Sequence, residues 1–140
     1  LTSIVVAEDI ELQIPPLSHG QAAQILNTWL EAWQQGMCRP LPVAVRTAFA
    51  WLTVEHDKKL SKEEDASLRQ EKALASAAEC YEGTMNTSGE AQQSPILARH
   101  YADFTALNAS QEFTHWVQQL YQPLFVHTLE QQPVSENEHE

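Results

Sequence analysis

The sequence predicts a mainly helical protein of about five helices, preceded by a short N-terminal β strand or hairpin. Apolar residues recur at helical spacing over most of the chain, most clearly in residues 22–33. Only residues 4–14 alternate with the period of two that a strand requires. We therefore divide the 140 residues into a strand or hairpin at 1–17 that completes a sheet, a helical domain at 18–130 and a disordered acidic tail at 131–140.

The N-terminal segment is expected to form one strand, or two short strands that reverse near Glu8 and Asp9. Apart from Glu8, the even positions of this segment are apolar: Ile4, Val6, Ile10, Leu12 and Ile14. A single strand or hairpin is not stable alone, so we expect this segment to complete a sheet whose other strands lie upstream, or to pair within this chain or with another copy. Because the chain begins with Leu1, we interpret it as a segment of a longer polypeptide.

Residues 18–52 predict two helices joined by a proline-containing linker. Ser18 and Gln21 form a capping-box pattern that begins the first helix. Gly36 is expected to end that helix, and Pro42 suits the first turn of the second. An aromatic stripe at helical spacing is normally the face that packs, so we expect the tryptophans of this pair to lie in the core. They are Trp29, Trp33 and Trp51.

A third helix is expected to follow a polar linker. Residues 61–64 offer a second capping box, and the acidic run 63–65 suits a helix N-terminus because the helix dipole favours anions there. The helix should end near Glu82, with Gly83 as its stop signal. Residues 84–93 lack periodicity and predict an exposed loop.

Two more helices are expected in the C-terminal part. Ser94 and Pro95 begin a helix whose apolar positions continue to Phe104. Asn108 and Gln111 should cap the last helix, and Pro123 must kink or end it because proline has no N–H to donate.

The charge of the chain limits its partners. The formal net charge is −11, with 19 acidic against 8 basic residues. A surface of that sign repels phosphate backbones, which disfavours a nucleic-acid groove in this segment. No signal sequence or membrane-spanning run is visible. Cys38 and Cys80 lack metal spacing, so we expect reduced thiols in the cytoplasm.

The sequence offers no credible catalytic, cofactor-binding or metal-binding residue. A metal-dependent nuclease needs an acidic residue, any one residue and then a lysine on a strand. Asp57-Lys58-Lys59 matches these residue types but lies in a polar linker. The histidines lack zinc-site spacing: His19, His56, His100, His115, His127 and His139. Arg99, His100 and Tyr101 carry groups that can contact a phosphate, but a solvated helix face is the simpler interpretation.

Several ordered stretches resemble one protein family. The string Trp29-Leu-Glu-Ala-Trp-Gln-Gln-Gly-Met37 is similar to the C-terminal part of the RecC family, the gamma subunit of exodeoxyribonuclease V. Further similar stretches occur in the same order within Leu17 to Phe125, at 40–42, 47–52, 81–83, 89–90, 97–101 and 120–125.

The resemblance implies a role in the bacterial RecBCD helicase-nuclease. RecC is similar to a helicase that has lost ATPase function, and its C-terminal region is similar to the restriction-endonuclease fold without the catalytic acids and lysine. The family binds RecB and RecD, helps to split duplex DNA ends, and recognises Chi in recombinational repair. ATP and Mg²⁺ act through the other subunits, and the Chi-recognising residues are expected outside this segment.

Three functional hypotheses follow from these observations. The first is a non-catalytic scaffold for subunit assembly, whose parent is a subunit of the exonuclease. An unpaired strand edge would favour self-association of the isolated segment. The second is an unrelated helical adaptor or regulatory domain. The third, an active nuclease, would need a carboxylate cluster that the sequence does not show.

Overall fold

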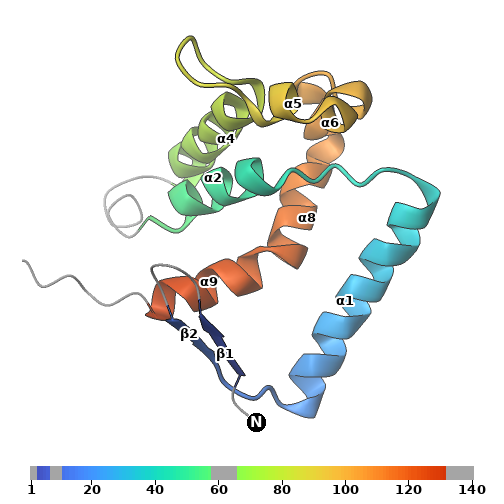
Figure 1. Ribbon diagram of the computed structural model, residues 1–140, viewed down its shortest axis with the longest axis vertical. Coiled ribbons are helices and arrows are strands. Elements are labelled where there is room, and N and C mark those ends of the chain that lie inside the picture. Colours follow the sequence, from blue (N-terminus) through green and yellow to red (C-terminus); the bar gives the residue numbers. More distant parts are fainter. Residues whose placement is uncertain (1–2, 7–10, 58–65, 132–140) are drawn as a thin grey trace, which may run out of the picture.

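The computed structural model describes residues 3–6, 11–57 and 66–131 of the chain. These residues form a mostly helical fold with a short N-terminal hairpin of two antiparallel strands (Figure 1), as the sequence predicts. In chain order the elements are β1 (Ser3–Val6), β2 (Glu11–Ile14), α1 (His19–Cys38), α2 (Val45–Glu55), α4 (Ala66–Glu82), α5 (Glu90–Gln93), α6 (Pro95–His100), α7 (Phe104–Leu107), the 3₁₀ turn η1 (Ala109–Gln111), α8 (Glu112–Leu120) and α9 (Gln122–Gln131).

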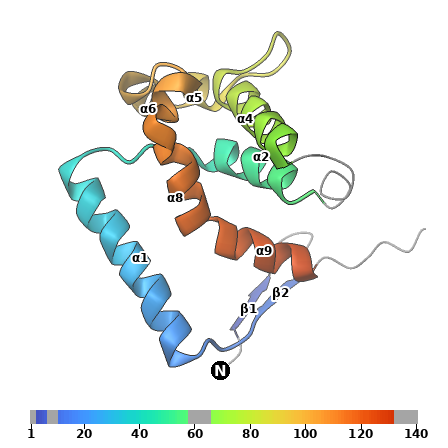
Figure 2. The same cartoon turned by 180° about the vertical axis from the view of Figure 1, so that it is seen from behind.

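The hairpin confirms the two-strand alternative. Its register pairs Ile4 with Gln13 and Val5 with Leu12. Directly paired residues share a face. The apolar even positions of β1 therefore lie on one face of the hairpin, and those of β2 lie on the other. The expected reversal near Glu8 and Asp9 lies outside the described residues. The hairpin lies beside α9 (Figures 1 and 2), where β2 contacts that helix.

Helix α1 begins as predicted but ends later. Both halves of the capping box are present: the Gln21 N–H donates to Ser18 Oγ at 3.3 Å, and the Ser18 N–H donates to Gln21 Oε1 at 3.2 Å. The prediction that Gly36 ends the helix is wrong, because α1 continues to Cys38 and the chain becomes extended only at Arg39. Pro40 lacks the N–H needed for a further turn. Pro42 also precedes α2 instead of lying in its first turn.

The buried core lies in a body of helices formed by α2, α4 and the short helices that follow them. Helices α2 and α4 make the most extensive helix contact, and Ala48, Ala73 and Ala77 are fully buried there. Small side chains let the two backbones approach closely and leave room for larger neighbours. The larger buried residues are Trp51, Leu52, Tyr81, Phe104, Leu107, Phe113, Val117 and Phe125.

Residues 84–93 are not the fully exposed loop that the sequence predicts. Helix α4 ends at Glu82 as expected, and Gly83 adopts a φ of +89° that favours glycine. Gly89 is buried close to this turn, and the chain then forms α5. After this turn the chain places Glu90 at the N-terminus of α2. Its carboxylate accepts hydrogen bonds from the Arg46 and Thr47 N–H groups at 3.1 and 2.8 Å.

The last helices also differ in detail from the prediction. The single helix expected from Ser94 to Phe104 is divided into α6 and α7 at residues 101–103. The predicted capping of α8 by Asn108 and Gln111 is wrong. Gln111 occupies the N-cap position, but it has a φ of +62° and its side chain makes no capping hydrogen bond. Pro123 does interrupt the helix, because α8 ends at Leu120 and α9 begins at Gln122.

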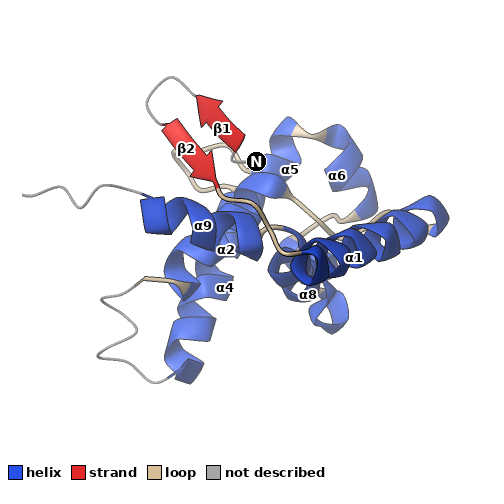
Figure 3. Ribbon diagram, turned by 90° about the horizontal axis from the view of Figure 1, so that it is seen from below, coloured by secondary structure: helices blue, strands red, loops and turns tan. Residues whose placement is uncertain are grey.

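Helix α1 extends away from this body of helices. It is attached through α8 near its C-terminus and runs apart from α2 and α4 in opposite views (Figures 1 and 2). Seen from below, it projects away from α4 and α9 (Figure 3). None of the helices in the described part of the chain has the length and hydropathy needed to cross a membrane.

Candidate functional site

The nuclease-like tripeptide gains no support from the structure. Asp57 follows the end of α2 in a coil, and its N–H donates to the Val54 carbonyl at 3.2 Å. A catalytic aspartate of this nuclease type would instead lie on a strand beside a second acid. Lys58 and Lys59 lie outside the described residues, as does the acidic run 63–65.

The histidines are distributed over separate elements. His19 begins α1, His56 follows α2, His100 ends α6 and His115 lies on α8. His127 on α9 has its Nε2 atom 3.1 Å from the Gln13 carbonyl oxygen of β2. Within residues 3–6, 11–57 and 66–131, no group of three or more His, Cys, Asp or Glu side chains is arranged to hold a metal ion. His139 lies outside these ranges.

Arg99, His100 and Tyr101 have different surroundings in the structure. Arg99 and His100 are exposed in the last turn of α6, where the helix dipole favours cations. The Tyr101 hydroxyl instead donates to the Pro40 carbonyl at 2.7 Å. Tyr101 therefore helps to hold the linker between α1 and α2 against the rest of the molecule.

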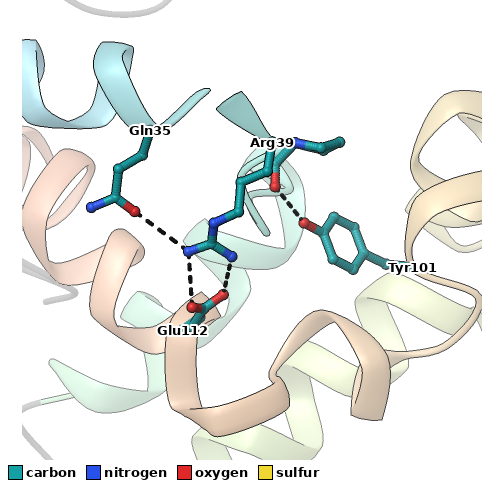
Figure 4. A network of polar contacts seen from close by, with 5 residues as sticks. Gln35, Arg39, Tyr101 and Glu112 are labelled. Atoms are coloured by element: carbon teal, nitrogen blue, oxygen red, sulfur yellow. Dashed lines mark hydrogen bonds and ion pairs between the residues drawn. The ribbon is translucent and has the colours of Figure 1, made fainter. Parts of the chain in front are cut away.

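A polar network anchors the C-terminal end of α1 (Figure 4). Arg39 donates two hydrogen bonds to the Glu112 carboxylate on α8, at 2.6 and 2.9 Å. Gln35 accepts a longer bond from the same guanidinium at 3.4 Å. The hydrogen bond from Arg39 lowers the pKa of Glu112, and the bond to Glu112 raises the pKa of Arg39. Sequence analysis missed this pair because 73 positions separate the two residues and neither belongs to a motif.

A cavity of about 540 Å³ lies next to this network. The indole Nε1 of Trp51 is buried and has no hydrogen-bond partner within the described part of the chain. The lining is rich in amide side chains, which can exchange hydrogen bonds with a neutral polar group. The lining residues are Gln35, Arg39, Trp51, Gln70, Ser110, Gln111, Glu112, Thr114, His115, Trp116 and Gln118.

The apolar face of α1 is the most unusual surface in the described chain. Trp51 is buried as predicted, but the prediction that Trp29 and Trp33 belong to the core is wrong, because they are 56% and 61% exposed. They belong to an exposed set that we call the α1 stripe: Leu26, Trp29, Leu30, Trp33 and Met37. Monomeric proteins seldom leave such contiguous apolar patches open, and those that do usually bind something there.

The α1 stripe is also free of charge. Glu31 is the sole Asp, Glu, Lys or Arg residue in the segment 19–38, although the chain as a whole carries a net charge of −11. Solvent-exposed helices normally carry charged residues on their open faces. This lack of charge is the sequence signal that could have distinguished a docking helix from a helix of the chain's own core.

The comparison with protein families concerns the N-terminal part of the chain. The model of the RecC C-terminal domain matches residues 3–56. Residues 3–56 are therefore similar to the RecC C-terminal domain family. The match contains β1, β2, α1 and α2, and therefore the whole α1 stripe. It confirms the resemblance to RecC in this segment, whereas the similar stretches in residues 81–125 lie beyond it. No curated protein matches the chain.

Proposed function

We propose that this chain acts as a non-catalytic assembly element of a RecC-like subunit in a cytoplasmic RecBCD-type helicase-nuclease. The observation that carries the proposal is the combination of the family match with the exposed α1 stripe: a segment similar to RecC leaves a large uncharged apolar face exposed. Such apolar faces are typical of permanent protein–protein interfaces. The RecB-like and RecD-like subunits are the proposed partners of the assembled subunit.

The proposed role leaves the chemistry to other parts of the complex. Duplex DNA ends, ATP and Mg²⁺ would be handled by the complete complex and its other subunits. The acidic composition of the chain favours this division, because a net charge of −11 opposes direct binding of a phosphate backbone. The relation of the fold to a catalytically inactive restriction-endonuclease-like domain is part of the same proposal.

Affinity purification from bacterial extract tests the assembly role. A tagged RecC-like subunit that contains residues 1–140 should recover both RecB-like and RecD-like proteins by mass spectrometry. The same subunit without these residues should lose at least one of them. Recovery of both partners by the truncated subunit would refute the assembly role, and recovery of neither by the complete subunit would favour an unrelated helical adaptor.

A further inference from the structure

Two sets of hydrogen-bond donors in the wall of the cavity beside the Arg39–Glu112 network lack an acceptor. Trp51 lines this cavity and is only 2% exposed, and its indole Nε1 has no hydrogen-bond partner within the described part of the chain. The first turn of α8 lies in the same wall, and no described side chain caps its N–H groups. An indole N–H can only donate, so it needs an acceptor when it is buried. The wall therefore favours a ligand with an acceptor oxygen.

The charges in the wall favour a neutral acceptor. The guanidinium of Arg39 is already bonded to the Glu112 carboxylate at 2.6 and 2.9 Å (Figure 4). A bound carboxylate or phosphate would share the cavity with Glu112 and would be repelled by the chain's net charge of −11. A bound cation would leave the indole N–H of Trp51 without an acceptor. A neutral carbonyl oxygen avoids both penalties.

The glutamines in the wall favour a carbonyl that belongs to an amide. A glutamine side chain carries an acceptor oxygen and two N–H donors in one plane. A ligand amide offers the same two functions, so it can exchange a pair of hydrogen bonds with such a side chain, whereas a hydroxyl combines both functions in one atom. The glutamines of the wall are Gln35, Gln70, Gln111 and Gln118.

A second hollow continues from this cavity along α9. It has a volume of about 610 Å³, and Gln118 borders both spaces. At about 1.5 Å per residue, the helical path from Gln111 to Val126 is at most about 22 Å long. That length accommodates about six residues of extended peptide at about 3.3 Å each. The second hollow is lined by Gln118, Gln119, Gln122, Pro123 and Val126.

We propose that the cavity binds a main-chain amide of an extended, uncharged peptide segment that continues along α8 and α9. The carbonyl oxygen of that amide accepts a hydrogen bond from Trp51 Nε1, and the glutamines of the two hollows pair with the neighbouring amides. The Nε1 atom is covered, so a lining side chain moves aside when the carbonyl enters. This site uses neither the α1 stripe nor the family match, and it is therefore separate from the assembly role.

The test follows the indole N–H signals of the ¹⁵N-labelled 140-residue chain by NMR, and W51F assigns the signal of Trp51. The amide probes are N-methylacetamide and a neutral six-residue peptide of alternating glycine and serine with blocked ends. Sodium acetate and glucose are the comparison probes. The variant Q119A/Q122A alters only the second hollow, and the matched control Q24A/Q34A changes two exposed glutamines of α1 outside both hollows. Circular dichroism of each variant checks that the helices form.

We expect both amide probes to cause a saturable downfield shift of the Trp51 indole proton, with half-saturation at an at least about tenfold lower concentration of the peptide. Q119A/Q122A should weaken peptide binding at least about fivefold and leave N-methylacetamide binding unchanged, whereas Q24A/Q34A should change neither. Absence of a saturable shift with N-methylacetamide would overturn the proposal, whether acetate or glucose saturates the signal instead or solvent alone fills the cavity. Equal half-saturation by the two amide probes, or unchanged peptide binding by Q119A/Q122A, would overturn the extension along α9.

Discussion

Helix α2 lacks a capping side chain of its own and is capped by Glu90 from α5. Its N-cap residue, Ala44, has no side-chain oxygen, whereas the Glu90 carboxylate accepts the N–H groups of Arg46 and Thr47. It also accepts the Thr47 hydroxyl at 2.8 Å, and that side chain is fully buried. The contact joins two segments more than forty positions apart, so its loss should weaken the helical body as a whole.

We expect E90A to reduce the free energy of unfolding by about 2–3 kcal/mol. Loss of an N-cap costs about 0.5–2 kcal/mol, and a hydrogen bond to a charged group contributes about 1.5–3 kcal/mol, but the two contributions overlap at this site. An unfolding entropy of about 2 cal/mol/K per residue converts this loss to a decrease of roughly 7–10 °C in Tm.

Urea and thermal unfolding followed by circular dichroism at 222 nm measure the effect. E79A is the matched control, because Glu79 is exposed on α4, and its substitution should change stability by less than about 0.5 kcal/mol. A double-mutant cycle of E90A with T47V should give a coupling energy of about 1 kcal/mol. A midpoint for E90A equal to that of E79A would show that Glu90 does not cap α2. Strict additivity in the cycle would show that its carboxylate is not coupled to the Thr47 hydroxyl.

Three further predictions concern the buried contacts around α4. A77L should lower the free energy of unfolding measured in urea by about 1–3 kcal/mol, because Ala77 is fully buried. A75L changes an exposed position and should not lower it; equal urea midpoints for the two variants would refute close packing at Ala77. G83A should cost about 1–3 kcal/mol because of its φ of +89°, whereas G20A, with no atom within 4 Å of the added Cβ, should be neutral or stabilising in the same assay. Burial raises the pKa of the Tyr81 hydroxyl, so the folded state keeps this proton to a higher pH than the unfolded chain. The free energy of unfolding should therefore fall as pH rises above about 10. Y81F should make this fall with pH, measured by urea unfolding, less steep; an unchanged fall would contradict this assignment.

Local signals in the sequence predicted the local structure well. Ser18 and Gln21 identified the start of α1, Gly83 identified the end of α4, and Pro123 identified the break between α8 and α9. Each of these signals depends on the steric or hydrogen-bonding properties of residues that are close in sequence. The hairpin also followed from a local alternation, although the register that places its apolar residues on opposite faces did not.

Features that depend on distant contacts were not predictable in this way. The Glu90 cap and the Arg39–Glu112 pair join segments that are remote in sequence, and nothing near either residue indicates its partner. The tryptophans of α1 were assigned to the core because an apolar stripe looks the same whether it faces its own body or a partner. Only the scarcity of charge on α1 separates the two cases.

Two of the contacts that hold α1 are open to water. The helix is held at its C-terminus by Arg39 and Glu112, which are partly exposed, and through the hairpin by the contact between Gln13 and His127. Water competes for both contacts, so we expect α1 to separate from the body of helices more readily than α2 and α4 separate from each other. Most of the stability of a helix in a protein comes from tertiary packing of its amphipathic face, and the apolar face of α1 has none within the described residues. In the uncomplexed chain the amide protons of α1 should therefore exchange with solvent through a subglobal opening, and docking of the stripe would couple the order of α1 to partner binding.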